Sequence, residues 1–515
     1  MLMFSIKNPW RTGLMTFAPR LALSLSAILG VLTTAAPAIA APWANVGDRA
    51  LRSDIEILHA RGLISGPITT WPIPVGYFEP LQDEGRLTGQ PEFVRMAVQR
   101  VLDKLGSGHH GGGLKAAGEL RLASEPNLIR DFGDNARDEV DARAGLDYDG
   151  ERFAANLRVG ALTPFGNGDS GARFTLDGTY ATALVGNWQL YGGYIDKWYG
   201  PGYASSLILS NNARPFPKIG ITRNNSTAFE TKWLSWLGRY QIDFFVGLLE
   251  EDSRDDRNTG VGSLRISIEP IDGLELTVTR VAQFCGGDNA CKPFNAAFGI
   301  NNTNKDRNAS NDEGTFEIKY TYDFNVVSFS PYLQIMNEDT GPFTHSYESH
   351  MGGLSWAGPW DQNGASWRLV AEYTDSRATL DAFSFGNRLP GFAYNNDQYT
   401  DGFRYRGRTM GFSLDSDSTL FTVSGLMLMP NGWTYRAAFH NAHINTAELA
   451  AAQASGSYLS NTVSALPVTV NQYEAGVTIP WQSFTFDLGV RYQDEQPFPD
   501  VGSQFNVEAG VQFRF

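Results

Sequence analysis

The C-terminal part of the chain alternates between apolar and polar side chains with a period of two. In the final ten residues, NVEAGVQFRF, every odd position from Val507 to Phe515 is apolar, and every even position is polar or glycine. Residues 483–492 repeat this pattern, and residues 473–479 do so before the turn at Pro480. Because successive side chains of a strand point to opposite faces, each segment is a strand with one apolar and one polar face.

Two architectures use such strands: a soluble sandwich, whose apolar face is a core, and a membrane barrel, whose apolar face meets lipid. Glu, Asp and Arg recur on the polar faces and aromatic residues gather at the strand ends, which favours the barrel. Residues 114–515 can supply about 16 to 20 strands, at roughly 20 to 25 residues per strand and connection. A last strand that ends on Phe515 also resembles the terminal signal of bacterial outer-membrane barrels.

Connection lengths predict the orientation of the barrel, because such barrels have short periplasmic turns and long outer loops. If Phe515 is periplasmic, residues 493–503 form an outer loop and residues 480–482 a periplasmic turn. Residues 441–471 are then outer and residues 430–432 periplasmic. Long and short connections alternate, as a barrel requires.

The N-terminus predicts export. Lys7, Arg11 and Arg20 precede an apolar run at 21–32, which ends in Ala38-Ile39-Ala40. This pattern is typical of a cleaved secretory signal at residues 1–40, and the alternative is a membrane-anchoring helix. The formal net charge of −14 becomes −17 without the three basic residues of that segment, which argues against nucleic acid as a partner.

Residues 41–113 have a helical period and predict a small bundle that ends in a Gly-rich linker. Leu51, Ile55 and Leu58 share one helix face, and Gly62 follows where the helix should end. A second apolar stripe begins at Val94, after the helix-starting Pro91. His109 and His110 in the linker could suggest metal, but a glycine-flanked pair without a spaced partner favours a flexible connection.

The only two cysteines, Cys285 and Cys291, lie close together in the exported part of the chain. Such a pair most simply forms one disulfide. A zinc site would need four ligands, and only Asp288 could join the cysteines within this loop. The sequence therefore predicts no metal and no cofactor.

Catalytic motifs are scarce. The sequence has no G-x-S-x-G or H-E-x-x-H motif, Ser205 and Ser206 have no nearby histidine, and Gly200-Pro201-Gly202 is not followed by the Lys of a phosphate loop. His440 shares a strand face with Arg436 and should point inward. We therefore predict no catalytic residues, although an outer-membrane hydrolase that uses His440 is the alternative.

Residues 385–408 combine Tyr, Phe, Asn, Asp and Arg, and the loop count puts them on the outer side or rim. This mixture suits sugar, whose hydroxyls need polar partners and whose C–H faces stack on aromatic rings. It equally suits an aromatic girdle followed by a solvated loop.

Three segments carry distinctive motifs: residues 51–74 with TWPIP, residues 198–217 with WYGPG and NNARPFP, and residues 406–418 with RGRTMGFSLDSDS. Together with the export signal and the terminal Phe, they make the chain resemble the capsule assembly Wzi family from about residue 45 to its end. The resemblance implies an all-β outer-membrane barrel of 18 antiparallel strands, residues 114–515, whose periplasmic mouth is closed by the helical bundle. It also implies a surface lectin that holds exported capsular polysaccharide without polymerising or exporting it. The alternative is an outer-membrane porin or saccharide channel.

The expected partners are surface polysaccharide, outer-membrane lipid and the barrel-assembly machinery during insertion, and the expected state is a monomer. Arg406, Arg408 and Tyr405 are the first candidate ligand-binding residues, because they lie in the outer aromatic-polar segment. Arg214, Asn212 and Trp198 come second. For Arg214 the competing interpretation is an ion pair with a lumenal carboxylate.

Overall fold

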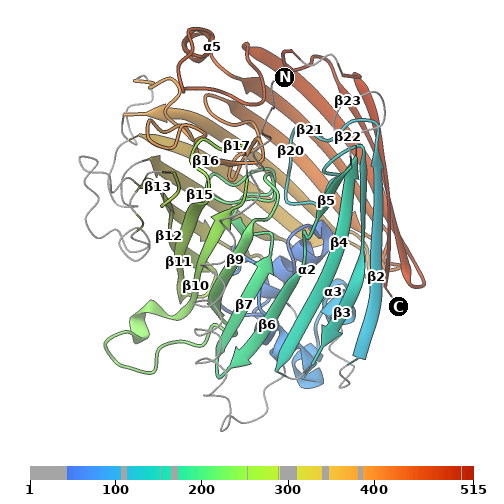
Figure 1. Cartoon of the computed structure of the whole chain (residues 1–515). Helices are drawn as coiled ribbons and strands as arrows, with labels where there is room; N and C mark the ends of the chain where they lie inside the picture. Colours follow the sequence, from blue (N-terminus) through green and yellow to red (C-terminus); the bar gives the residue numbers. More distant parts are fainter. Residues whose placement is uncertain are drawn as a thin grey trace, which may run out of the picture. The chain divides into compact units, whose positions relative to one another are not determined.

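The computed structural model describes residues 43–105, 113–150, 152–163, 172–251, 253–287, 289, 291, 310–338, 347–380, 387–499 and 502–514. The predicted signal segment and the two linker histidines lie outside these residues. In the described chain, antiparallel strands close into one barrel, with α-helices from the N-terminal region at one of its ends (Figure 1).

The barrel wall is an antiparallel sheet that closes on itself. Its strands are β2 (Gly113–Ala123), β3 (Val140–Asp149), β4 (Phe153–Thr163), β5 (Arg173–Thr175), β6 (Tyr180–Val185), β7 (Trp188–Tyr194), β9 (Pro217–Arg223), β10 (Arg239–Leu249), β11 (Thr259–Ile271), β12 (Leu274–Phe284), β13 (Asn311–Tyr320), β14 (Tyr322–Asp323), β15 (Ser328–Glu338), β16 (Glu348–Pro359), β17 (Ser366–Thr379), β20 (Thr419–Leu428), β21 (Thr434–Ile444), β22 (Val468–Trp481), β23 (Phe484–Gln493) and β24 (Phe505–Arg514). Among these 20 described segments, β5 and β6 both pair with β4, and β13 and β14 both pair with β15, which leaves 18 positions in the wall. The predicted fold class and strand number are confirmed.

The two faces of the wall have opposite character. Leu488, Val490 and Val507 expose 48%, 44% and 47% of their surface on the outer face. On the opposite, inner face, Arg436 of β21 forms two hydrogen bonds of 2.9 Å with Asp487 of β23, two strands away. An apolar exterior around a charged interior is the arrangement of a membrane barrel and excludes a soluble sandwich.

The two ends of the barrel differ in the length of their connections. Short connections such as 272–273, 429–433 and 482–483 occupy one end, which we call the turn end. Long connections such as 380–418 and 445–467 occupy the other, which we call the loop end and which carries α5 (Ala447–Ala454). The alternation predicted from the sequence is present.

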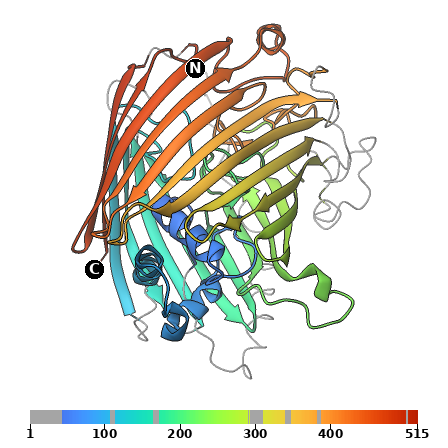
Figure 2. The same cartoon turned by 180° about the vertical axis from the view of Figure 1, so that it is seen from behind.

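The helices of the N-terminal region lie at the turn end (Figure 2). Helix α2 (Arg49–Ala60) begins at Asp48, whose side chain accepts a 2.9 Å hydrogen bond from the backbone N of Leu51. It ends just before Gly62, which has a φ of 67°. Helix α3 (Glu92–Leu105) follows Pro91 directly. The elements between them are β1 (Thr70–Trp71), η2 (Val75–Gln82) and η3 (Glu84–Leu87).

The apolar faces of α2 and α3 pack together as the periodicity predicts. Leu51, Ile55 and Leu58 share one buried cluster with Val94 and Val98. None of the helices in the described residues is long and apolar enough to cross a bilayer.

The middle of the lumen is filled by residues 195–216, which we call the inner segment. Its residues 207–209 are fully or almost fully buried. They belong to one apolar cluster with Tyr394, Phe403, Met410 and Phe412 from the long connection after β17. The backbone N of Ser210 donates a 2.8 Å hydrogen bond to the carbonyl of Met410. The long connection therefore folds into the barrel.

Candidate functional site

A buried carboxylate on α2 joins the helical region to the barrel wall. Glu56 lies 2.9 Å from Arg368 of β17 and 3.2 Å from Lys319 of β13, and it also pairs with Arg52 at 3.1 Å. The hydroxyl of Tyr203, in the inner segment, donates to the same carboxylate. Although burial opposes the charge, the neighbouring cations hold the pKa of Glu56 well below its usual range. Glu56 therefore connects helix, inner segment and wall.

Trp198 shapes the inner segment from within. It belongs to β8 (Trp198–Tyr199), which pairs with β1, and its side chain is 0% exposed. Its indole N–H donates a 3.1 Å hydrogen bond to the carbonyl of Gly202, which also accepts a 2.8 Å hydrogen bond from Arg52. A Cβ at Gly202 would lie 2.3 Å from the carbonyl of Ser205, so this corner requires glycine. In this position Trp198 has no surface open to a ligand.

Residues 404–409 form a hairpin at the loop end, which we call the rim hairpin: β18 (Arg404–Tyr405) pairs with β19 (Arg408–Thr409). Two hydrogen bonds, of 2.9 and 2.7 Å, join Arg404 to Asp415. Tyr405 is 2% exposed, and its ring packs edge-on against Phe216 of the inner segment. Only the tip of the hairpin, with Arg406, is exposed. Tyr405 therefore fixes the hairpin that presents Arg406.

Arg408 is a partly buried cation. It donates a 3.3 Å hydrogen bond to the side-chain oxygen of Asn212, and no carboxylate of the described chain forms an ion pair with it. Burial, together with the neighbouring charge of Arg137, lowers the pKa of Arg408 to about 10. Asn212 itself is buried and donates to the carbonyl of Thr409 at 2.9 Å. Arg408 therefore has guanidinium donors without a carboxylate partner in the described chain, whereas Asn212 holds the hairpin in place.

The structure places Arg214 in an ion pair. Its Nε and Nη2 atoms each donate a 2.9 Å hydrogen bond to the carboxylate of Asp177, which precedes β6. For Arg214 the sequence left an ion pair with a lumenal carboxylate as the alternative to sugar contact, and this ion pair is present. The guanidinium thereby connects the inner segment to the wall.

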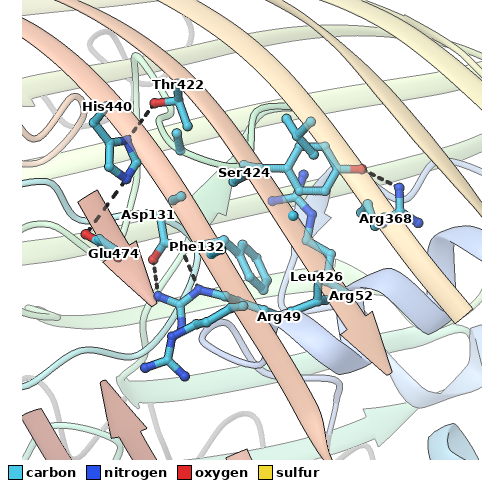
Figure 3. A pocket seen from close by; sticks show the side chains of 17 residues that line it. Arg49, Arg52, Asp131, Phe132, Arg368, Thr422, Ser424, Leu426, His440 and Glu474 are labelled. Atoms are coloured by element: carbon cyan, nitrogen blue, oxygen red, sulfur yellow. Dashed lines mark hydrogen bonds and ion pairs between the residues drawn. The ribbon is translucent and has the colours of Figure 1, made fainter. Parts of the chain in front are cut away.

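A small pocket lies inside the barrel, between the wall and the helical region, and is lined by both charged and apolar side chains (Figure 3). Arg49 of α2 donates to Asp131 at 2.6 Å across it. The inward direction predicted for His440 is confirmed, because its ring lines the cavity with Thr422, 2.8 Å away, and Glu474. Arg49 and Asp131 could not be identified from the sequence, because they come from segments far apart in the chain.

The cavity does not hold a hydrolytic triad. The nitrogen of His440 that faces Glu474 lies 3.8 Å from the carboxylate, beyond hydrogen-bond distance. Glu474 instead accepts a 2.9 Å hydrogen bond from Asn127. The histidine is therefore not oriented by an acid as a catalytic base would be.

Cys285 and Cys291 form a disulfide just after β12, at the loop end. The hydroxyl of Tyr399 donates a 3.0 Å hydrogen bond to the carbonyl of Cys285. The disulfide therefore borders the long connection that folds into the lumen.

Three aromatic residues of segment 385–408 lie elsewhere than both sequence interpretations placed them. Tyr394, Tyr399 and Phe403 are 0% exposed, in the barrel interior rather than on a girdle or an outer surface. The hydroxyl of Tyr394 donates a 2.7 Å hydrogen bond to the carbonyl of Leu207. The reason is physical: a wall of this size leaves a wide lumen, and burying large aromatic side chains fills it.

Comparisons with known proteins agree on one family. The sequence model of the capsule assembly protein Wzi family matches residues 117–486. A 55.8 kDa protein in the cps region of Klebsiella pneumoniae is 25% identical over 362 residues, which cover 68% of this chain and 69% of that protein. The solved structure of Wzi from Escherichia coli, described as a carbohydrate binding β-barrel involved in group 1 capsule assembly, superposes with a TM-score of 0.74 and 21% identity. That match covers 92% of this chain and 99% of the other, and it supports the fold.

Proposed function

Because the chain belongs to the capsule assembly protein Wzi family, we propose that it is an outer-membrane protein that binds surface polysaccharide and helps to hold it on the cell. The apolar exterior of the barrel supports an outer-membrane location. The Escherichia coli protein with the same fold is described as binding carbohydrate, which supports the ligand class. In this proposal residues 1–40 are removed on export, and residues 41–113 face the periplasm.

The filled lumen is the observation that favours a binding function over a transport function. The helical region occupies the turn end, the inner segment the middle, and the long connection after β17 the loop end. Buried charges such as Glu56 join these layers to the wall, and removing such a contact is costly. A glycan on the loop end would therefore meet a packed surface.

The rim hairpin is the proposed contact with the glycan. Arg406 is exposed at its tip, and Arg408 has donors without a carboxylate partner in the described chain. A guanidinium presents several N–H donors in one plane, which suits the closely spaced oxygens of a sugar ring or a sugar carboxylate. Tyr405 and Asn212 support the hairpin from beneath.

A binding measurement tests this assignment. Purified protein is titrated with polysaccharide taken from the surface of the producing cells. Each of the changes Arg406→Ala and Arg408→Ala should lower affinity by roughly ten- to a hundredfold, because a hydrogen bond to a charged group contributes roughly 1.5 to 3 kcal/mol. Arg95→Ala, an exposed arginine of α3, is the matched control and should bind as the unchanged protein does. Equal affinity in all four proteins would exclude the rim hairpin.

Binding without cleavage is the second part of the proposal. The chain length of the glycan should remain the same after prolonged incubation with the protein. Shortening of the glycan that disappears in His440→Ala would instead support the hydrolase, since His440 lines the lumenal cavity.

A further inference from the structure

The connection between β9 and β10, residues 224–238, carries an exposed apolar group at the turn end. Trp233 is 88% exposed, Trp236 68% and Leu234 41%. They lie in or just before the single turn η4 (Ser235–Leu237), in the light green loop that projects sideways from the wall in both Figure 1 and Figure 2. Large apolar side chains gathered on one projection indicate a surface that is covered in the native setting.

Ring stacking and hydrogen bonds hold the base of this connection. The ring of Tyr240 is stacked on Phe229 at 3.8 Å between centroids, with 2° between the planes, and the guanidinium of Arg223 lies 3.5 Å from the centre of the same ring. Arg223 also donates to the carbonyls of Thr227 and Tyr240, at 3.1 and 2.8 Å. At the tip, the indole N–H of Trp236 donates a 2.9 Å hydrogen bond to the backbone carbonyl of Trp233. The apolar side chains are therefore held in a defined position.

The base continues the lipid-facing surface of the barrel. Along β10 the side chains alternate, with Gln241 and Asp243 buried inside and Ile242 and Phe244 partly exposed outside. Tyr240 is next on the outer side, and it carries the stacked Phe229. The apolar column that faces lipid therefore reaches the base of this connection at Tyr240 and Phe229.

We propose that Trp233, Leu234 and Trp236 insert into the periplasmic leaflet of the outer membrane, at the boundary between headgroups and acyl chains of phospholipid. Tryptophan favours this boundary because its ring is apolar and its N–H is polar. Lys232, next to the inserted side chains and exposed, lies where it can meet headgroup phosphates. The sideways projection extends the membrane contact of the barrel beyond its wall.

Depth-dependent quenching tests the proposal. Both cysteines of the chain are in the disulfide, so Ser235→Cys can carry a single fluorescent label between the two tryptophans. The labelled protein is reconstituted into phospholipid vesicles that contain nitroxide lipid. A label on Ser455→Cys, at the end of α5, serves as the reference. We expect roughly threefold stronger quenching by lipid at position 235, with weaker quenching there by a water-soluble quencher on both sides of the membrane.

A pair of variants separates insertion from mere proximity. Trp233→Ser with Trp236→Ser should remove most of the lipid quenching at position 235. Trp360→Ser, which changes another exposed tryptophan at the turn end, should leave it unchanged. Equal quenching by lipid at positions 235 and 455 would overturn the proposal and indicate a surface for a protein partner. Neither outcome depends on whether the protein binds polysaccharide.

Discussion

Removing the charge of Glu56 should loosen the helical region from the barrel. The side chain of Glu56 is 7% exposed, and those of its partners Arg368 and Lys319 are 5% and 3% exposed. Glu56→Gln keeps the shape but leaves these buried cations without their carboxylate. Breaking a buried ion pair in this way costs about 3 to 5 kcal/mol. The open state of the helical region should then be populated between roughly 10² and 4 × 10³ times more often.

Amide hydrogen exchange of α2 measures this opening directly. Exchange in residues 49–60 should accelerate by about two orders of magnitude or more in Glu56→Gln, while exchange in β22–β24 stays slow. Glu79→Gln, an exposed glutamate of η2, is the control and should exchange as the unchanged protein does. In planar bilayers Glu56→Gln should show openings that are absent from the control.

The pH dependence follows from the lowered pKa of Glu56. The stabilising contribution is complete above the pKa of the released carboxylate and disappears as pH falls through the lower, docked value. Docking should therefore be insensitive to pH near neutrality and weaken in acid. Exchange of α2 that is the same in Glu56→Gln and Glu79→Gln would refute the role assigned to this network.

Three further predictions concern the inner segment, the loop end and the cavity. Trp198→Ala should destabilise the barrel by about 3 to 5 kcal/mol, seen as a lower temperature at which the folded band is lost on gels, because a fully buried ring is deleted. Changing Cys285 and Cys291 to Ser should cost only about 2 kcal/mol in denaturant unfolding, since the disulfide closes a short loop, and should leave glycan affinity intact. Burial opposes the charge of Asp131, but the ion pair with Arg49 lowers the pKa of Asp131 below its usual range. Amide hydrogen exchange near Arg49 should therefore rise as pH falls through that pKa, and Asp131→Asn should abolish this pH response.

The wall could be predicted from the sequence because its signal is local. Alternation at positions such as Glu474, Val477 and Leu488 needs only the geometry of one strand, whereas the pairing of Val477 with Leu488 is known from the structure. The signal for helix α2 was equally local, since the apolar face of Leu51, Ile55 and Leu58 and the end at Gly62 are read from neighbouring residues. In both cases neighbouring residues decide the structure.

The filling of the lumen could not be predicted, because it depends on contacts between distant segments. Tyr394 and Leu207 meet inside the barrel although 187 residues separate them. In the sequence, the aromatic-polar stretch around Tyr394 has the composition of a surface loop. Only closure of the wall creates the interior that its rings fill. For Arg214, the ion pair with a carboxylate was foreseen as a kind of contact, but Asp177 was not identifiable as the partner.

The most direct test of the central proposal is the distribution of polysaccharide in a strain that lacks this gene. Cell-bound and released polysaccharide are both measured, in the deletion strain and after complementation with the unchanged gene. The account predicts that polysaccharide moves from the cell surface into the medium while the total stays constant. An unchanged distribution, or a fall in the total, would contradict a protein that holds polysaccharide on the cell after its export.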